Sequence, residues 1–149
     1  MPEQVTKRKC VLVVDDEARF CTIVAEFLGG RHYDVVTATS SSEALQQLEH
    51  AIPDVVLLDV VMPGVSGLEL LKLIRSRAFP PRVIIVTATD TEEVAQQALR
   101  DGAEAYMCKP VSLDALARVI SGFWPPTQQP WGSTAAWGER TPSQPTCGL

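Results

Sequence analysis

The chain has 149 residues, a length that usually forms one domain with room for a short appendage. Apolar residues make up 46% and charged residues 21%, as in folded globular proteins. The net charge of −5 argues against a nucleic-acid partner, because nucleic acids are bound by basic surfaces. No stretch approaches the roughly 18 apolar residues of a membrane span, and the N-terminus lacks the apolar core of a secretory signal. We therefore expect a cytoplasmic location and no membrane partner.

Short apolar runs recur along the chain and predict strands. They are rich in Val, Ile or Leu or are very short, and three of them are apolar without alternation. That pattern is typical of strands buried on both faces of a parallel sheet. The predicted strands are Cys10–Val14, Tyr33–Ala38, Val55–Leu58, Val83–Val86 and Ala105–Cys108.

Segments with helical periodicity follow each of these runs. In the first segment the apolar residues share one helix face: Phe20, Ile23, Val24, Phe27 and Leu28. The alternation predicts five βα units, and right-handed crossovers place helices on both faces of one parallel sheet. Five units are too few for a closed eight-stranded barrel, so we expect an open doubly wound α/β fold.

Polar residues and glycines mark the expected ends of the helices. Ser40, Ser66 and Asp90 each precede a glutamate by three residues, which is the spacing of a capping box. Gly29-Gly30 and Asp101-Gly102 follow helical patterns, where a residue in the left-handed conformation is expected.

The composition changes after Trp124. The remaining residues contain five Pro, three Gly, two Trp and one charge of each sign. A segment of this kind cannot cover a core, so we expect a disordered tail without a site of its own. Alternatively, Trp131 and Trp137 form a docking peptide. The expected division is an N-terminal tail at 1–8, one domain over 9–124 and a C-terminal tail at 125–149.

Chemically distinctive residues stand at the ends of four predicted strands. Asp15-Asp16 follow the first strand, Asp59 the third, Thr87 the fourth and Lys109-Pro110 the fifth. In open parallel sheets, ligands bind beyond the carboxyl ends of the strands. We therefore expect these side chains to gather at one site.

The residue types in this set fit a phosphoryl group. Carboxylates at one edge repel each other and require a counter-ion, and Mg²⁺ prefers oxygen ligands and keeps several waters. Lys109 adds a positive charge and Thr87 a hydroxyl, beside a carboxylate that can act as a nucleophile. Taken singly, each residue has a simpler explanation. Asp15 or Asp16 caps a helix, Asp59 begins a loop, Thr87 is a strand residue and Lys109 a surface charge.

Four segments carry motifs in a defined order. They are Val11–Glu17, Leu57–Gly64, Val86–Ala88 and Asp101–Pro110. Together they resemble the response-regulator receiver domain of two-component signalling, and the resemblance covers about residues 9–124. It implies a flavodoxin-like (βα)5 fold with sheet order 2-1-3-4-5.

The resemblance implies a role for each residue of the set. Asp59 is implied to accept a phosphoryl group from the phosphohistidine of a sensor histidine kinase or phosphotransfer protein. Asp16 is implied to bind Mg²⁺ directly, Asp15 to hold it partly through water, and the Val61 carbonyl to complete the protein ligands together with Asp59. Lys109 is implied to pair with the acceptor carboxylate and then with the phosphoryl oxygens.

The same resemblance implies a conformational switch. Thr87 matches the switch hydroxyl, Tyr106 the switch aromatic, and the Lys109–Pro110 bond the cis peptide of the family. Phosphorylation is expected to draw Thr87 inward and to let Tyr106 rotate into the vacated space. That movement changes the surface formed by the fourth helix, the strand Ala105–Cys108 and the last helix. Without a switch role, Tyr106 is a half-exposed strand aromatic.

The sequence therefore predicts a phospho-accepting receiver that depends on Mg²⁺. It signals to an unidentified protein target, as a monomer or a weak phosphorylation-dependent dimer, since no output domain is visible. It is not an enzyme beyond its own phosphorylation and dephosphorylation.

Two alternatives compete with this prediction. One is a receiver-like interaction module that does not turn over phosphate. The other is an FMN-binding flavodoxin, but Asp15-Asp16-Glu17 stand where its Ser/Thr/Gly-rich phosphate loop would be. A further choice concerns Phe20, Ile23 and Val24, which either dock a kinase helix or form the core face of their own helix.

Overall fold

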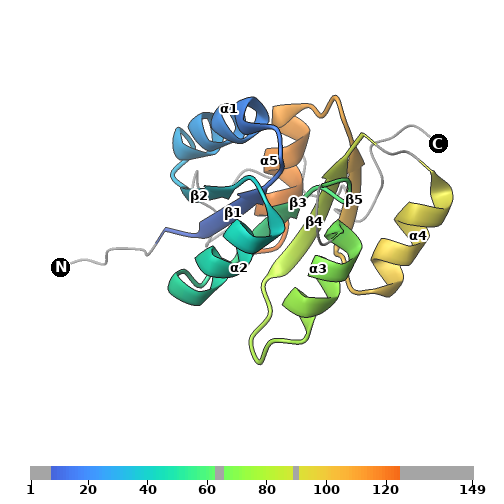
Figure 1. Ribbon diagram of the computed structural model, residues 1–149. Helices are drawn as coiled ribbons and strands as arrows, with labels where there is room; N and C mark the ends of the chain where they lie inside the picture. The colour runs from blue at the N-terminus through green and yellow to red at the C-terminus, as the bar shows by residue number, and fades with distance from the viewer. Residues whose placement is uncertain (1–7, 63–65, 89–90, 125–149) are drawn as a thin grey trace.

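The computed structural model describes residues 8–62, 66–88 and 91–124. In these ranges strands and helices alternate along the chain (Figure 1). The strands are β1 (Cys10–Val14), β2 (Asp34–Ala38), β3 (Val55–Leu58), β4 (Arg82–Thr87) and β5 (Ala105–Cys108). The helices are α1 (Ala18–Gly29), α2 (Ser41–His50), α3 (Gly67–Arg75), α4 (Glu92–Arg100) and α5 (Leu113–Ser121).

The strands form one parallel sheet in the order β2-β1-β3-β4-β5. This is the flavodoxin-like α/β fold, as predicted. Every residue of β3 is buried, as are four of the five residues of β1. Burial on both faces of the sheet explains why these strands are apolar without alternation.

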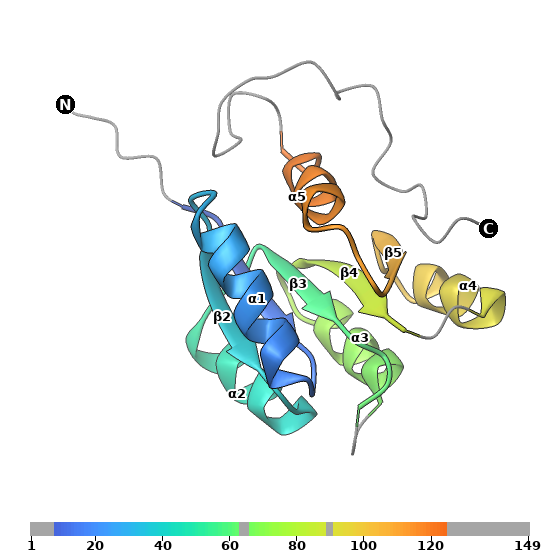
Figure 2. The same ribbon diagram turned by 90° about the horizontal axis from the view of Figure 1, so that it is seen from above.

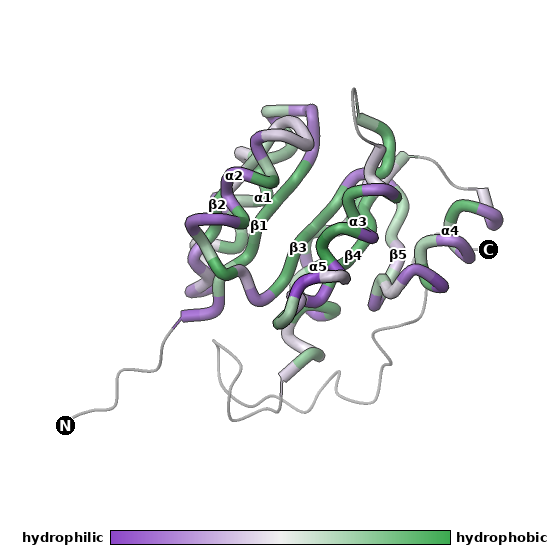
Figure 3. Tube along the Cα trace, turned by 60° about the horizontal axis from the view of Figure 1, so that its bottom comes forward, coloured by the Kyte–Doolittle hydropathy of each residue, from purple (hydrophilic) through white to green (hydrophobic). Residues whose placement is uncertain are grey.

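The helices cover both faces of the sheet (Figures 1 and 2). α1 and α5 lie on one face, where Val24 and Leu116 pack in one apolar cluster. α2, α3 and α4 lie on the other, where Ala44, Ile74 and Ala98 share a second cluster. Hydrophobic residues are concentrated in the central strands, while the helices alternate between hydrophobic and hydrophilic faces (Figure 3). Among the described residues, no helix is long and apolar enough to cross a bilayer.

The helix starts agree with the capping pattern at two of three places. The hydroxyls of Ser40 and Ser66 accept hydrogen bonds from the N–H groups three residues later, at 3.1 and 3.3 Å. α4 is capped by Thr91, whose hydroxyl accepts from the Val94 N–H at 3.4 Å. The predicted cap Asp90 lies outside the described residues.

The left-handed residue after α1 is not where the glycine pair predicts it. Gly30 is right-handed, with φ −68°, whereas His32 has φ 73°. Two turn hydrogen bonds extend the end of α1, because the Arg31 N–H donates to the Leu28 carbonyl and the His32 N–H donates to the Gly29 carbonyl. The left-handed position therefore falls two residues later than Gly30. Gly102 has φ 109°, as predicted.

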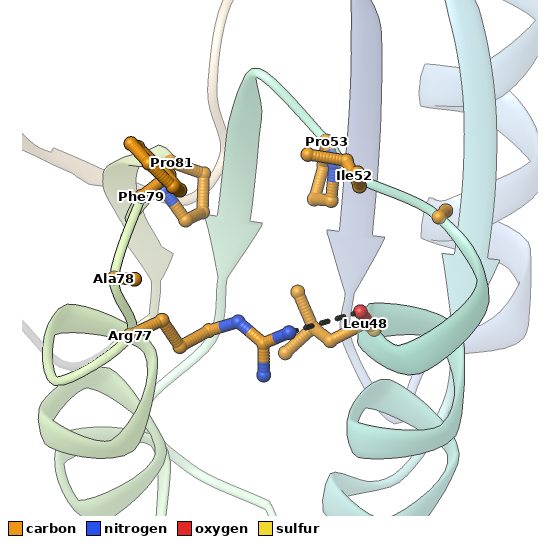
Figure 4. Close-up of a pocket in the computed structure, with 8 residues that line it drawn as sticks. Leu48, Ile52, Pro53, Arg77, Ala78, Phe79 and Pro81 are labelled. Atoms are coloured by element: carbon orange, nitrogen blue, oxygen red, sulfur yellow. Dashed lines mark hydrogen bonds between the residues drawn. The ribbon is translucent and has the colours of Figure 1, made fainter.

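A hollow of about 360 Å³ lies between the connections that follow α2 and α3 (Figure 4). Arg77 reaches across it and donates a hydrogen bond to the Leu48 carbonyl at 3.2 Å. Ile52 and Phe79 are exposed at its margin. These connections enter the amino ends of β3 and β4, whereas Asp59 follows the carboxyl end of β3. The hollow is therefore separate from the predicted site.

Candidate functional site

The register of the sheet brings the predicted site residues to one edge. Val14, the last residue of β1, pairs with the last residue of β3, so Asp15 and Asp59 leave neighbouring strands at the same level. The Asp59 N–H donates to the Val14 carbonyl at 3.0 Å. Across the sheet, the Lys109 N–H donates to the Thr87 carbonyl at 2.8 Å. The strand ladder itself thus positions the site.

Three carboxylates converge at this edge. One oxygen from each of Asp15, Asp16 and Asp59 lies within 4.8 Å of the others. Asp15 and Asp59 are buried and Asp16 is exposed. A cluster of carboxylate oxygens with one side open to solvent fits a hard divalent cation that keeps part of its water shell. The residues present therefore fit Mg²⁺.

The first pair of aspartates does not cap α1. The N-cap residue of α1 is Glu17, whose side chain makes no capping hydrogen bond. Asp15 Oδ1 accepts a hydrogen bond from the Glu17 N–H at 2.9 Å, which fixes the turn that precedes the helix. The simple capping explanation is therefore wrong for Asp15 and Asp16.

Both oxygens of Asp59 are engaged. Oδ1 accepts the Thr87 hydroxyl at 2.7 Å and the Val61 N–H at 3.0 Å. Oδ2 accepts the Lys109 ammonium at 3.3 Å. Only 7% of the Asp59 side chain is exposed, so a buried carboxylate is held in one orientation.

Lys109 is nearer to Asp15 than to Asp59. Its Nζ lies 2.5 Å from Asp15 Oδ2, against 3.3 Å for Asp59 Oδ2, and 3.6 Å from Glu17 Oε1. The Lys109–Pro110 peptide is cis. Lys109 therefore pairs with two carboxylates of the cluster in this structure, whereas the resemblance implied that it pairs with the acceptor carboxylate alone.

The electrostatics of the cluster are dominated by burial and by this lysine. Burial raises the pKa of Asp15, against the opposing effect of the hydrogen bonds from Lys109 and the Glu17 N–H. Burial by itself would lower the pKa of Lys109, but Asp15 and Asp59 outweigh it, so this pKa is raised. The lysine is therefore an ammonium ion that offsets part of the repulsion between the carboxylates.

Thr87 and Tyr106 are both buried, with 0% and 3% exposure. The Thr87 hydroxyl is already bonded to Asp59, and Tyr106 already belongs to the core cluster under α2, α3 and α4. Tyr106 is therefore not a half-exposed aromatic. The switch roles of the two residues stay a prediction.

The structure separates the three residues of α1 whose role the sequence left open. Val24 is fully buried and belongs to the core. Ile23 is 46% exposed and faces solvent. Phe20 is partly buried, with its ring beneath the ammonium group of Lys109 at 4.4 Å.

Sequence reasoning missed two residues that support the site, Phe20 as a partner of Lys109 and Gly67. A Cβ added at Gly67 would lie 2.3 Å from the Asp59 carbonyl oxygen and 2.4 Å from the Cα of Val60. The sequence signal for Gly67 was a glycine directly after the cap Ser66, at a helix start where no turn requires glycine. No sequence signal pointed to the Phe20–Lys109 contact.

Comparisons with known proteins agree with this geometry. The model of the family described as "Response regulator receiver domain" matches residues 11–121. The chain belongs to this family. The alternative of an FMN-binding flavodoxin, which shares only the topology, is therefore wrong.

A curated relative gives the same result. The alkaline phosphatase synthesis transcriptional regulatory protein PhoP of Bacillus subtilis (strain 168) is 38% identical over 104 residues. The match covers 70% of this chain and 43% of PhoP, so the chain spans less than half of that relative.

Two solved structures are similar in fold and sequence. A CheY-like response regulator receiver domain protein from Methanospirillum hungatei JF-1 has TM-score 0.73 and 29% identity, over 76% of this chain and 91% of that one. A response regulator from Burkholderia pseudomallei has TM-score 0.69 and 29% identity, over 72% and 64% of the two chains. The latter was crystallised with a phosphorylated aspartic acid, a calcium ion and citrate.

Proposed function

We propose that this chain accepts a phosphoryl group on Asp59 from the phosphohistidine of a sensor histidine kinase or phosphotransfer protein. The observation that carries the proposal is the placement of Asp59. It is a buried carboxylate bonded to Lys109 and Thr87, beside the carboxylates of Asp15 and Asp16. The Burkholderia relative, which holds a phosphorylated aspartic acid and a divalent cation, supports the same chemistry.

In the proposed reaction, a carboxylate oxygen of Asp59 attacks the phosphorus atom of the phosphohistidine. The O–P bond forms as the N–P bond breaks, and the electron pair of the broken bond stays on the imidazole. The imidazole leaves as a neutral ring when its other nitrogen carries a proton. Lys109 pairs with one phosphoryl oxygen. The Thr87 hydroxyl gives up its hydrogen bond to Asp59 and donates to another phosphoryl oxygen.

The carboxylates of Asp15, Asp16 and Asp59, with the Val61 carbonyl, would hold Mg²⁺. Its positive charge, when bound, neutralises phosphoryl oxygens. Asp16 is exposed and free to act as a direct ligand, whereas Asp15 is committed to Lys109 and to the Glu17 N–H. This difference supports a water-mediated part for Asp15.

The proposal extends to the output of the protein. Thr87 and Tyr106 would couple the state of Asp59 to the surface of α4, β5 and α5, which signals to another protein. The chain would act in the cytoplasm, because receiver domains are typically intracellular. It would do so as a monomer or a weak phosphorylation-dependent dimer. The predicted tail without a site, residues 125–149, lies outside the described residues.

Incubation with acetyl phosphate tests the proposal. A carboxylate oxygen attacks the phosphorus atom and acetate leaves, so intact-mass spectrometry should show one added phosphoryl group in Mg²⁺ and none in excess EDTA. Asp59→Asn should gain nothing. Absence of any gain in the wild type with Mg²⁺ would favour the interaction module that does not turn over phosphate.

A further inference from the structure

Phe20 lies against the ammonium group of Lys109. Nζ is 4.4 Å from the centroid of the ring, a distance at which the face of an aromatic ring attracts a cation. The two residues are remote in sequence, since Phe20 lies in the first turn of α1 and Lys109 follows β5. Phe20 also packs against the apolar cluster beneath α1 and α5, and this packing restricts the position of the ring.

The ring completes the surroundings of this ammonium group. Asp15 and Asp59 accept hydrogen bonds from Nζ, and the Glu17 carboxylate is 3.6 Å away. Only 15% of the Lys109 side chain is exposed. An aromatic face attracts the charge, accepts no conventional hydrogen bond and keeps water from that side. The donors of the ammonium are therefore directed toward the carboxylates.

We infer that Phe20 is a positioning residue for phosphoryl transfer, which acts by holding the Lys109 ammonium beside Asp59. The inference rests on the proposed function. Preorganised charge stabilises a transition state because nothing has to be rearranged as charge develops. A lysine side chain has many rotamers and a strongly hydrated head, so without the ring the ammonium would take up water and spend less time at the acceptor.

Substitutions that separate the ring face from mere packing test this role. Phe20→Leu keeps an apolar side chain and removes the aromatic face, whereas Phe20→Tyr keeps the face. With acetyl phosphate and saturating Mg²⁺, Phe20→Leu should be phosphorylated about 3- to 30-fold more slowly than wild type. Phe20→Tyr should stay within about twofold of wild type, because it retains the attraction for the cation.

Phe27→Leu is the matched control. Phe27 lies on the same helix, packs against the same apolar cluster and has the Arg31 guanidinium 4.6 Å from its ring. Phe27 lies seven residues after Phe20, about 10 Å further along the helix axis, so its substitution should leave the phosphorylation rate unchanged. A slowing equal to that of Phe20→Leu would show that loss of any aromatic residue from α1 is sufficient, and would overturn the inference.

Two further measurements show whether Phe20 acts through Lys109. Ring currents should shift the Lys109 ε-methylene protons upfield in the NMR spectrum of the wild type, and Phe20→Leu should abolish this shift. In a Lys109→Gln background, Phe20→Leu should cause no further slowing of the residual Mg²⁺-dependent reaction. Independent, additive effects of the two substitutions would contradict the inference.

The outcomes distinguish this inference from the proposed function. A wild-type protein that gains no phosphoryl group would overturn the proposed function, and the inference with it. If the wild type is phosphorylated but Phe20→Leu reacts at the wild-type rate, the inference alone is wrong. It is also wrong if Phe20→Tyr is as slow as Phe20→Leu, because packing would then explain the effect.

Discussion

The side chains at the carboxyl ends of the strands form a charge cluster that is only partly balanced within the protein. Asp15, Asp16 and Asp59 bring three negative charges together, and Lys109 contributes one positive charge between two of them. Like charges at such distances destabilise each other unless a counter-ion is taken up. This imbalance is the physical reason to expect a divalent cation at the site.

Asp16 is the carboxylate whose removal should weaken cation binding most cleanly. It is exposed, so Asp16→Ala removes a hard oxygen ligand without leaving a buried cavity. We expect the Mg²⁺ affinity, measured by isothermal titration calorimetry, to fall by about tenfold or more. Glu49→Ala, at an exposed position on α2, is the control. Equal affinities for Asp16→Ala and the wild type would remove Asp16 from the proposed ligand set.

Cys21 provides a test of burial beside this cluster. Its thiol donates to the Asp15 carbonyl at 3.3 Å, and burial raises its pKa from 9.0 to about 11. A raised pKa means that the folded state holds the proton more tightly than the unfolded state. The contribution of this raised pKa to the stability of the fold is therefore complete below pH 9, and it is lost as the pH rises through 11.

Urea unfolding of the wild type and of Cys21→Ala measures this effect. The difference in unfolding free energy between the two proteins should be constant up to about pH 9 and should then shrink by on the order of 2 kcal/mol by pH 11. Other groups that titrate in this range cancel in the comparison. A difference that stays constant across the range would show that the thiol titrates normally.

α3 begins directly against the backbone of the acceptor Asp59. Its first residue, Gly67, donates its N–H to the Val60 carbonyl at 3.1 Å, and its Cα faces the backbone that follows Asp59. No side chain fits between these two segments. The helix start thus supports the acceptor loop from behind.

Gly67→Ala should therefore destabilise the fold by about 2 kcal/mol or more, because backbone rather than a flexible side chain must move. Gly29→Ala is the matched control, since nothing lies within 4 Å of a Cβ there. It should be neutral or stabilise by about 0.5–1 kcal/mol. Urea unfolding measures both, and an unaffected Gly67→Ala protein would show that the close approach is not rigid.

Hydrophobic patterning was sufficient for most strand boundaries, although β2 begins at Asp34 and not at the predicted Tyr33. β1, β3 and β5 have the predicted limits, because each is an apolar run with polar residues at its ends. β4 is longer than predicted, since Arg82 and Thr87 pair with Val55 and Cys108 through their backbones. Hydropathy does not report such hydrogen bonding at a strand end.

The site could be predicted as a set of residues but not as an arrangement. Strand order and register place Asp15, Asp59 and Thr87 together whatever their rotamers. The nearer partner of Lys109 depends on side-chain torsions that spacing does not encode. The contact with Phe20 depends on how the first turn of α1 is placed relative to Lys109 after β5, and the apolar period of α1 does not determine that placement.

For the chain as a whole, the described domain ends in a cluster of aromatic and basic residues. Trp124 packs near Tyr33, at 6.5 Å between ring centroids, and Lys9 lies over its ring. The Arg82 guanidinium lies 5.0 Å from the ring centroid of Phe123. These contacts pack the segment that follows α5 against the amino ends of β1 and β4.

Truncation after Trp124 should therefore lower the thermal midpoint by no more than a few degrees, because the removed segment is poor in aliphatic residues. Truncation after Ser121, which also removes Phe123 and Trp124, should cost considerably more. Differential scanning calorimetry compares the two. Loss of cooperative unfolding in the longer truncated chain would contradict the expectation that residues 125–149 are dispensable for the fold.

The position of the phosphoryl group is the central claim, and chemical trapping measures it most directly. Borohydride reduces the carbonyl of an acyl phosphate to an alcohol with loss of phosphate, so a phosphorylated aspartate becomes homoserine. After acetyl phosphate and Mg²⁺, peptide mass spectrometry should find homoserine at position 59 and unmodified Asp15 and Asp16. Homoserine at another aspartate, or a mass gain that borohydride does not convert at position 59, would contradict the account.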